Sequence, residues 1–309
     1  MKLRYSILIA AIFMTVLFGC SLGVDRDQNV TASVALQAAD ENDPITVPEA
    51  AGPAAKWSEY THRSISSIAA SQWGLSAGRA ANISEASDDP DTYQSGIDNG
   101  YNQQWSHAYI YDRWFSTSFY LWGDADQDFH DNIAGPQGGE GYAGLFAGYF
   151  YGSNQYQGDR YLGYALHFIE DVSITVHSTA PTSTGITVPF STVDMLTHHF
   201  DFESWVNNNM NAGYNLLDAV ANDYYYYPVT DLAQSLKNAA WASCAYKGTS
   251  SMGYAAWKAF RSAGYPTGAG TGGSTLAENV KKMLISAGRY AKGAVKYTMD
   301  AYGQWGSEY

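Results

Sequence analysis

The stretch that decides the fold reads LGYALHFIEDVSITVH over residues 162–177. Its apolar residues follow helical spacing rather than the alternation of a strand. In a helix, residues four apart lie on one face, so His167 and Asp171 would point in the same direction. His177 follows six residues later, beyond the predicted helix end, where a returning loop could bring it to the same point. Because imidazole and carboxylate are ligands that zinc accepts, this segment predicts part of a metal site.

A second pair of the same kind lies downstream, at His199 and Glu203. Two helices that each offer a histidine and an acid four residues apart can build a metal cluster between them. One such pair alone is more often an ion pair on a helix surface. Two pairs together with His177 favour a metal site.

Helical spacing is also commoner than strand alternation along the rest of the chain. The predicted fold class is all-α, a single compact multi-helix domain with a zinc cluster in its helical core. A Gly-rich loop is expected over 264–273. Residues 184–192 could form a short extended segment. The glycines of the last predicted helix indicate either a break or close packing. Helices are predicted over 64–74, 141–150, 161–171, 200–209, 229–244 and 275–302.

The N-terminus has the pattern of an export signal. Lys2 and Arg4 precede an apolar run over residues 5–18, which is too short for a comfortable membrane span. The run ends in Leu17-Phe18-Gly19-Cys20, which resembles the bacterial lipobox, whose cysteine is lipidated. Residues 1–20 are therefore predicted to be a lipoprotein-type signal peptide. An ordinary signal peptide with an incidental cysteine is the alternative.

Composition separates a linker from a folded domain. Residues 21–56 contain no aromatic residue and are rich in small and polar residues, so they are predicted to be a disordered linker or propeptide. The folded domain is expected over 57–309. The formal charge of the whole chain is −13, and no basic stripe typical of a nucleic-acid binder is visible. The two cysteines, Cys20 and Cys244, exclude a zinc site of the CxxC type.

These motifs resemble those of the bacterial zinc-dependent phospholipases C, a family related to the fungal single-strand nucleases. The family pattern is H-x3-D-x5-H followed by H-x3-E or H-x3-D, and this chain matches it at His167, Asp171, His177, His199 and Glu203. The family also has an N-terminal tryptophan, whose α-amino nitrogen and carbonyl oxygen bind zinc, with a histidine downstream. Trp57 and His62 match that pair, and the segments at 90–93 and 107–112 look like two further family motifs.

The resemblance implies three zinc ions and an expected set of ligands. That set is Trp57, His62, Asp91, His107, His167, Asp171, His177, His199 and Glu203. Asp91 is also expected to be catalytic, as a ligand that takes the proton of the attacking water. Asp98 competes for its place, and Asp91 is preferred because the family aspartate lies farther ahead of its histidine. Trp57 can offer its α-amino group only if the chain is cut after Lys56, which would release the domain from a lipid anchor at Cys20.

The function implied is that of an exported phospholipase C that cleaves phosphatidylcholine-type lipids to diacylglycerol and a phosphorylated head group. The expected partners are phospholipid and the membrane surface, with nucleic acid disfavoured, and the chain is expected to be a monomer. It would be membrane-anchored or, if cut before Trp57, secreted. Two alternatives stay open. The Trp57-to-His62 spacing resembles that of the nucleases, and a non-catalytic zinc-binding surface lipoprotein would also keep the histidines.

Overall fold

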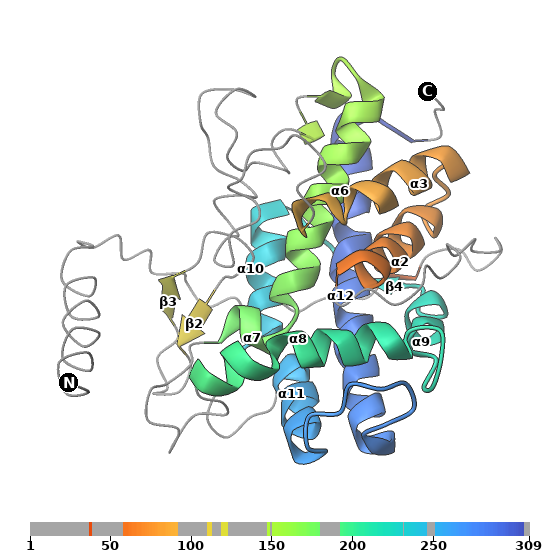
Figure 1. The fold of residues 1–309 in the computed structure, drawn as a ribbon. Helices are drawn as coiled ribbons and strands as arrows, with labels where there is room; N and C mark the ends of the chain where they lie inside the picture. Colours follow the sequence, from red (N-terminus) through yellow and green to blue (C-terminus); the bar gives the residue numbers. More distant parts are fainter. Residues whose placement is uncertain are drawn as a thin grey trace, which may run out of the picture. The chain divides into compact units, whose positions relative to one another are not determined.

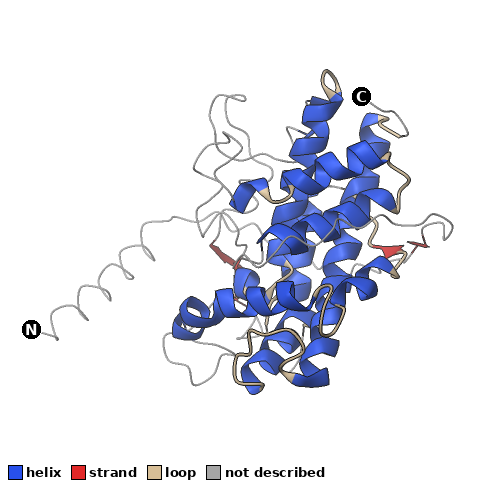
Figure 2. Cartoon of the chain, turned by 45° about the vertical axis from the view of Figure 1, so that its right-hand side comes forward, coloured by secondary structure: helices blue, strands red, loops and turns tan. Residues whose placement is uncertain are grey.

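The structure is a computed structural model, and the residues that it describes belong to one compact unit assigned to Ala35–Tyr309. Figures 1 and 2 show that this unit is built almost wholly from helices. The all-α prediction is therefore confirmed for the part of the chain that is described. That part comprises residues 37–38, 58–91, 110–112, 119–122, 147–148, 150–179, 192–230, 232–245 and 251–305.

Helices of varied length follow one another along the described chain. They are α2 (Ser58–Ser71), α3 (Ala77–Ala86), the 3-10 turn η1 (Asp89–Asp91), α6 (Gln155–Val172), α7 (Thr175–Ser178), α8 (Thr192–Asn209), α9 (Leu216–Ala221), α10 (Leu232–Ser243), α11 (Met252–Ser262) and α12 (Gly273–Tyr302). Five of the predicted helices overlap α2, α6, α8, α10 and α12, and the sixth, over 141–150, falls largely outside the described residues. Helices α3, α7, α9 and α11 were not predicted. Among the described residues, no helix has both the length and the apolar character needed to cross a bilayer.

The described strands form two short antiparallel pairs. β2 (Ile110–Asp112) pairs with β3 (Phe119–Trp122). β1 (Gln37–Ala38) pairs with β4 (Tyr225–Tyr226). The described part of the predicted linker over 21–56 thus consists of two residues, and both are bound to the folded domain as a strand.

Helix α12 is the longest of the described helices, and it runs unbroken for 30 residues. It packs against α2, α6, α9, α10 and α11, and Figure 1 shows it in blue behind α6 and α2. Its glycines mark close packing rather than a break. A Cβ on Gly293 would lie 2.0 Å from the Tyr227 carbonyl oxygen, so only glycine lets the end of β4 approach the helix this closely.

Helix α6 is the inner helix that positions the site. Every residue from Leu162 to Val172 is buried, which is typical of a helix surrounded by others. Gly163 lets α3 approach, because a Cβ there would lie 2.4 Å from the Ile83 carbonyl oxygen. Since α6 also carries buried ionisable side chains, these need partners inside the protein to offset their lost hydration.

The chain turns back after α6 and is fixed there by α10. The Ser243 hydroxyl donates to the Ser173 carbonyl oxygen over 2.7 Å, and the Ala245 N–H donates to the Thr179 hydroxyl over 2.7 Å. These bonds hold the short helix α7 at the end of α6. His177 therefore lies beyond the end of α6, as predicted, but on a helical turn rather than in a loop.

Candidate metal centre

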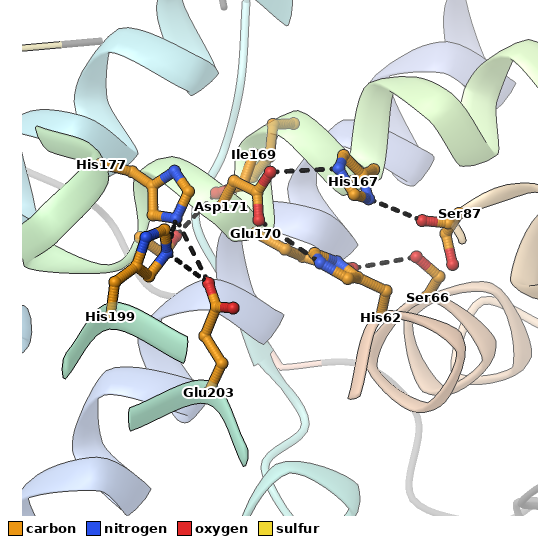
Figure 3. Close-up of polar contacts among 11 residues, drawn as sticks. His62, Ser66, Ser87, His167, Ile169, Glu170, Asp171, His177, His199 and Glu203 are labelled. Carbon is orange, nitrogen blue, oxygen red and sulfur yellow. Dashed lines mark hydrogen bonds and ion pairs between the residues drawn. The ribbon is translucent and has the colours of Figure 1, made fainter. Parts of the chain in front are cut away.

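Helices α2 and α6 bring His62, His167 and Asp171 together in the core. The Asp171 carboxylate lies between the two imidazoles: Oδ2 is 3.1 Å from His167 Nε2, and Oδ1 is 3.4 Å from His62 Nε2. The two rings are stacked, with their centroids 4.2 Å apart. Figure 3 shows these side chains converging from two helices. We call these three residues the first group.

The outer nitrogens of the first group are also engaged. His62 Nδ1 is 2.6 Å from Glu170 Oε2, and His167 Nδ1 is 2.8 Å from the Ser87 carbonyl oxygen. A carbonyl oxygen can only accept, so His167 donates from Nδ1, and its Nε2 faces Asp171. The Ser66 hydroxyl donates to the other Glu170 oxygen over 2.9 Å. Both rings are therefore fixed with Nε2 facing the Asp171 carboxylate.

The pKa of His62 reflects this crowding of carboxylates. Burial alone would lower the pKa, but the hydrogen bonds and negative charges of Asp171 and Glu170 outweigh it and raise the pKa well above its usual value. The position thus favours a positive charge strongly. A bound cation would satisfy the same carboxylates.

Helices α7 and α8 bring His177, His199 and Glu203 together in a second group. His199 Nε2 is 2.6 Å from Glu203 Oε1 and 2.8 Å from His177 Nε2, and His177 Nε2 is 3.4 Å from the same oxygen. Three potential ligand atoms thus point at one spot (Figure 3). Two imidazole nitrogens this close need a proton or a cation between their lone pairs.

Glu203 is ionised in this setting. Burial would raise the pKa of its carboxyl, but the charges and hydrogen bonds of His199 and His177 prevail and lower the pKa to about 2. A buried carboxylate that keeps its charge is a suitable ligand for a divalent ion.

Both groups fit a metal ion by donor type and by spacing. Each offers two imidazole nitrogens and one carboxylate oxygen, all within 4.8 Å of one another and all on buried residues. Zinc binds imidazole and carboxylate at about 2.0–2.2 Å, so tetrahedral ligands lie about 3.3 Å from one another. The distances of 2.6–3.4 Å within the groups are close to that separation. Three protein ligands would leave a fourth position for water or substrate.

The structure brings together six of the nine predicted ligands. The two predicted pairs with a spacing of four residues are both present on helices, and each belongs to a different group of three potential ligands. His62 joins the first pair and His177 joins the second. Asp91 ends η1, and its side chain lies outside the described residues. Trp57, His107 and the competing Asp98 also lie outside them.

Sequence reasoning assigned no role to Glu170, Ser66 or Ser87. A signal for Glu170 exists, because two consecutive acids in an otherwise apolar helix must both find buried partners. Ser66 lies four residues after His62 and therefore on the same face of α2. The Ser87 contact uses a carbonyl oxygen, and no residue type predicts it.

Comparison with known proteins does not assign this chain to a family. No protein-family model and no curated protein matches its sequence.

Proposed function

We propose that this chain is an exported zinc-dependent phosphodiester hydrolase that cleaves phosphatidylcholine-type lipids to diacylglycerol and a phosphorylated head group. The observation that carries the proposal is the presence of two buried groups of two imidazoles and one carboxylate. Their residues also have the spacing found in the zinc-dependent phospholipases C. The ligands would be His62, His167 and Asp171 for one ion, and His177, His199 and Glu203 for another.

Bound zinc would lower the pKa of water to about 7 and offset the charge of a phosphodiester. The chain contributes ligands that are already oriented. Glu170 and the Ser87 carbonyl oxygen engage the Nδ1 atoms of His62 and His167. Glu203 is held ionised by its histidines. Little reorganisation is then needed when the ions bind.

Asp91 is the proposed general base. It ends η1, which packs against α3 and α6. Ser87, four residues earlier, contacts His167 through its carbonyl oxygen. Since four residues span at most about 14 Å, the Asp91 backbone lies within that distance of Ser87. Asp91 is preferred over Asp98, on the family spacing alone, as the carboxylate that takes a proton from the attacking water.

Two features favour lipid over nucleic acid. The formal charge of −13 opposes binding of a polynucleotide. Glu203 also stands where the phospholipase branch has glutamate and the nucleases usually have aspartate. The Trp57-to-His62 spacing supports a single-strand nuclease as the second candidate.

The test compares two neighbouring histidines. His199 belongs to the second group, whereas His198 is bonded to Asp201 over 2.9 Å and stacks on Tyr265. Loss of a residue that only supports a ligand costs 10–100-fold, so H199A should lose more than about 100-fold in hydrolysis. H198A should retain wild-type zinc content and activity. The mature chain is assayed on phosphatidylcholine vesicles and on single-stranded DNA, each with a chelator control.

The other possible results of these assays would indicate a different function for this chain. Cleavage of DNA but not lipid would support the nuclease. Bound zinc without hydrolysis of either substrate would support a non-catalytic zinc-binding lipoprotein. Two histidines and a carboxylate also suit ferrous iron, so iron rather than zinc in the purified chain would contradict the proposal.

A further inference from the structure

Glu170 is a buried carboxylate that lies behind the first group rather than in it. Its side chain is fully buried on α6, next in sequence to Asp171. One carboxylate oxygen is 2.6 Å from His62 Nδ1, and the other accepts the Ser66 hydroxyl over 2.9 Å. A buried acid with both oxygens engaged is fixed in orientation.

This contact fixes the orientation of the His62 ring. With Nδ1 bonded to Glu170, Nε2 faces Asp171 at 3.4 Å. The His62 ring is also stacked on the His167 ring. A carboxylate behind a histidine fixes its tautomer, makes its other nitrogen a stronger donor and thereby raises metal affinity.

Charge distinguishes the two groups as well. Asp171 and Glu170 place two carboxylates around the first group. Each group has one carboxylate of its own, Asp171 or Glu203, and Glu170 adds a second beside the first group. Greater carboxylate charge around a site strengthens the binding of a divalent cation.

We propose that Glu170, as a positioning residue acting through His62, makes the first group the tighter of the two metal positions. The first equivalent of zinc binds at His62, His167 and Asp171, and the second group fills afterwards. This inference rests on the proposed function in one respect, namely that both groups bind zinc. It does not depend on which substrate is cleaved.

The experiment first isolates each group with a histidine variant and then removes the negative charge of Glu170. H199A leaves the first group as the intact one, and H167A leaves the second. The Glu170→Gln side chain has nearly the same shape as glutamate and keeps an oxygen that can accept from His62 Nδ1, whereas E170A removes that oxygen too.

Zinc affinity of the full chain is measured by competition with a chromophoric chelator. In the H199A background, E170Q should weaken zinc binding by about 10-fold and E170A by up to about 100-fold. In the H167A background, E170Q should leave the affinity unchanged.

Cobalt provides an independent readout. The visible absorption of Co²⁺ reports its ligands, so H199A and H167A give reference spectra for the two groups. The first equivalent added to the wild type should give the H199A spectrum, and E170Q should shift it toward that of H167A.

Three results would overturn the inference: an H167A-type spectrum for the first equivalent in the wild type, an unchanged zinc affinity of E170Q in the H199A background, or a loss confined to the H167A background. These measurements use no substrate. A chain that fills in the expected order but cleaves no phosphodiester would therefore refute the proposed function alone.

Discussion

Lys292 is a buried ammonium group on α12, with 1% of its surface exposed. Its Nζ donates to the Asp223 carbonyl oxygen and lies 3.3 Å from the Asp223 carboxylate, which also binds Arg289 through two hydrogen bonds. The Lys292 carbonyl oxygen accepts from the Trp73 indole over 2.8 Å. Burial lowers the pKa of Lys292 to about 8, although Asp223 partly opposes the shift.

Replacing Lys292 with methionine should change how stability depends on pH. Between about pH 8 and 10 the unfolded lysine is protonated and the folded one is not, so the folded state binds fewer protons and its stability rises with pH. The unfolding free energy of wild type minus K292M should be constant below pH 8 and rise above it by about 1.4 kcal/mol per pH unit. Denaturant unfolding of zinc-saturated chains measures this difference. The same slope in both chains would show that Lys292 does not titrate in this window.

Helices α3 and α6 approach each other closely at Gly163, four residues before His167. A Cβ on Gly163 would lie 2.4 Å from the Ile83 carbonyl oxygen, 2.7 Å from Ala86 Cβ and 3.0 Å from the Ser87 nitrogen. Backbone atoms cannot move aside as a flexible side chain can. The two helices would therefore have to separate, and Ser87 would withdraw from His167.

Gly163→Ala should accordingly reduce both stability and metal binding. Overpacking of this kind costs about 1–3 kcal/mol of unfolding free energy, and loss of the support behind His167 should weaken zinc binding by about 10-fold. Gly78→Ala on α3 is the control, because a Cβ there meets nothing within 4 Å. It should be neutral or stabilise by up to about 1 kcal/mol. A G163A chain as stable and as tightly zinc-binding as G78A would contradict the described packing.

At the scale of the whole molecule, the segment before the domain bears on the metal content. Helix α2 begins at Ser58, directly after Trp57, and His62 lies on its second turn. Trp57 itself lies outside the described residues, and a cut after Lys56 would create a free α-amino group five residues before His62 in the sequence. In the preceding segment, the two described residues, Gln37 and Ala38, pair with β4.

We expect the mature chain to begin at Trp57 and to bind three zinc ions, as the resemblance implies. Intact-mass spectrometry of the chain from its producing cells gives the N-terminus, and elemental analysis gives the zinc content. A form that begins at Cys20 should bind fewer ions, because an amide nitrogen replaces the α-amino ligand at Trp57. Equal zinc content in both forms would remove Trp57 from the ligand set.

The sequence by itself determined the helical class and the two pairs of ligands four residues apart. His167 with Asp171 and His199 with Glu203 could be predicted because helix periodicity alone places such residues on one face. The same periodicity identified most of α6, α8, α10 and α12. These are local properties of the chain, so they can be predicted without knowing any contact between distant residues.

Only the tertiary structure decided which residues complete each group. His62 lies 105 residues before His167, and His177 reaches His199 because Ser243 and Thr179 fix the turn after α6 against α10. Glu170 acquires its role from a helix 104 residues away that carries Ser66. Such partnerships depend on how helices pack, and helix packing follows from side-chain shape across the whole core rather than from spacing along the chain.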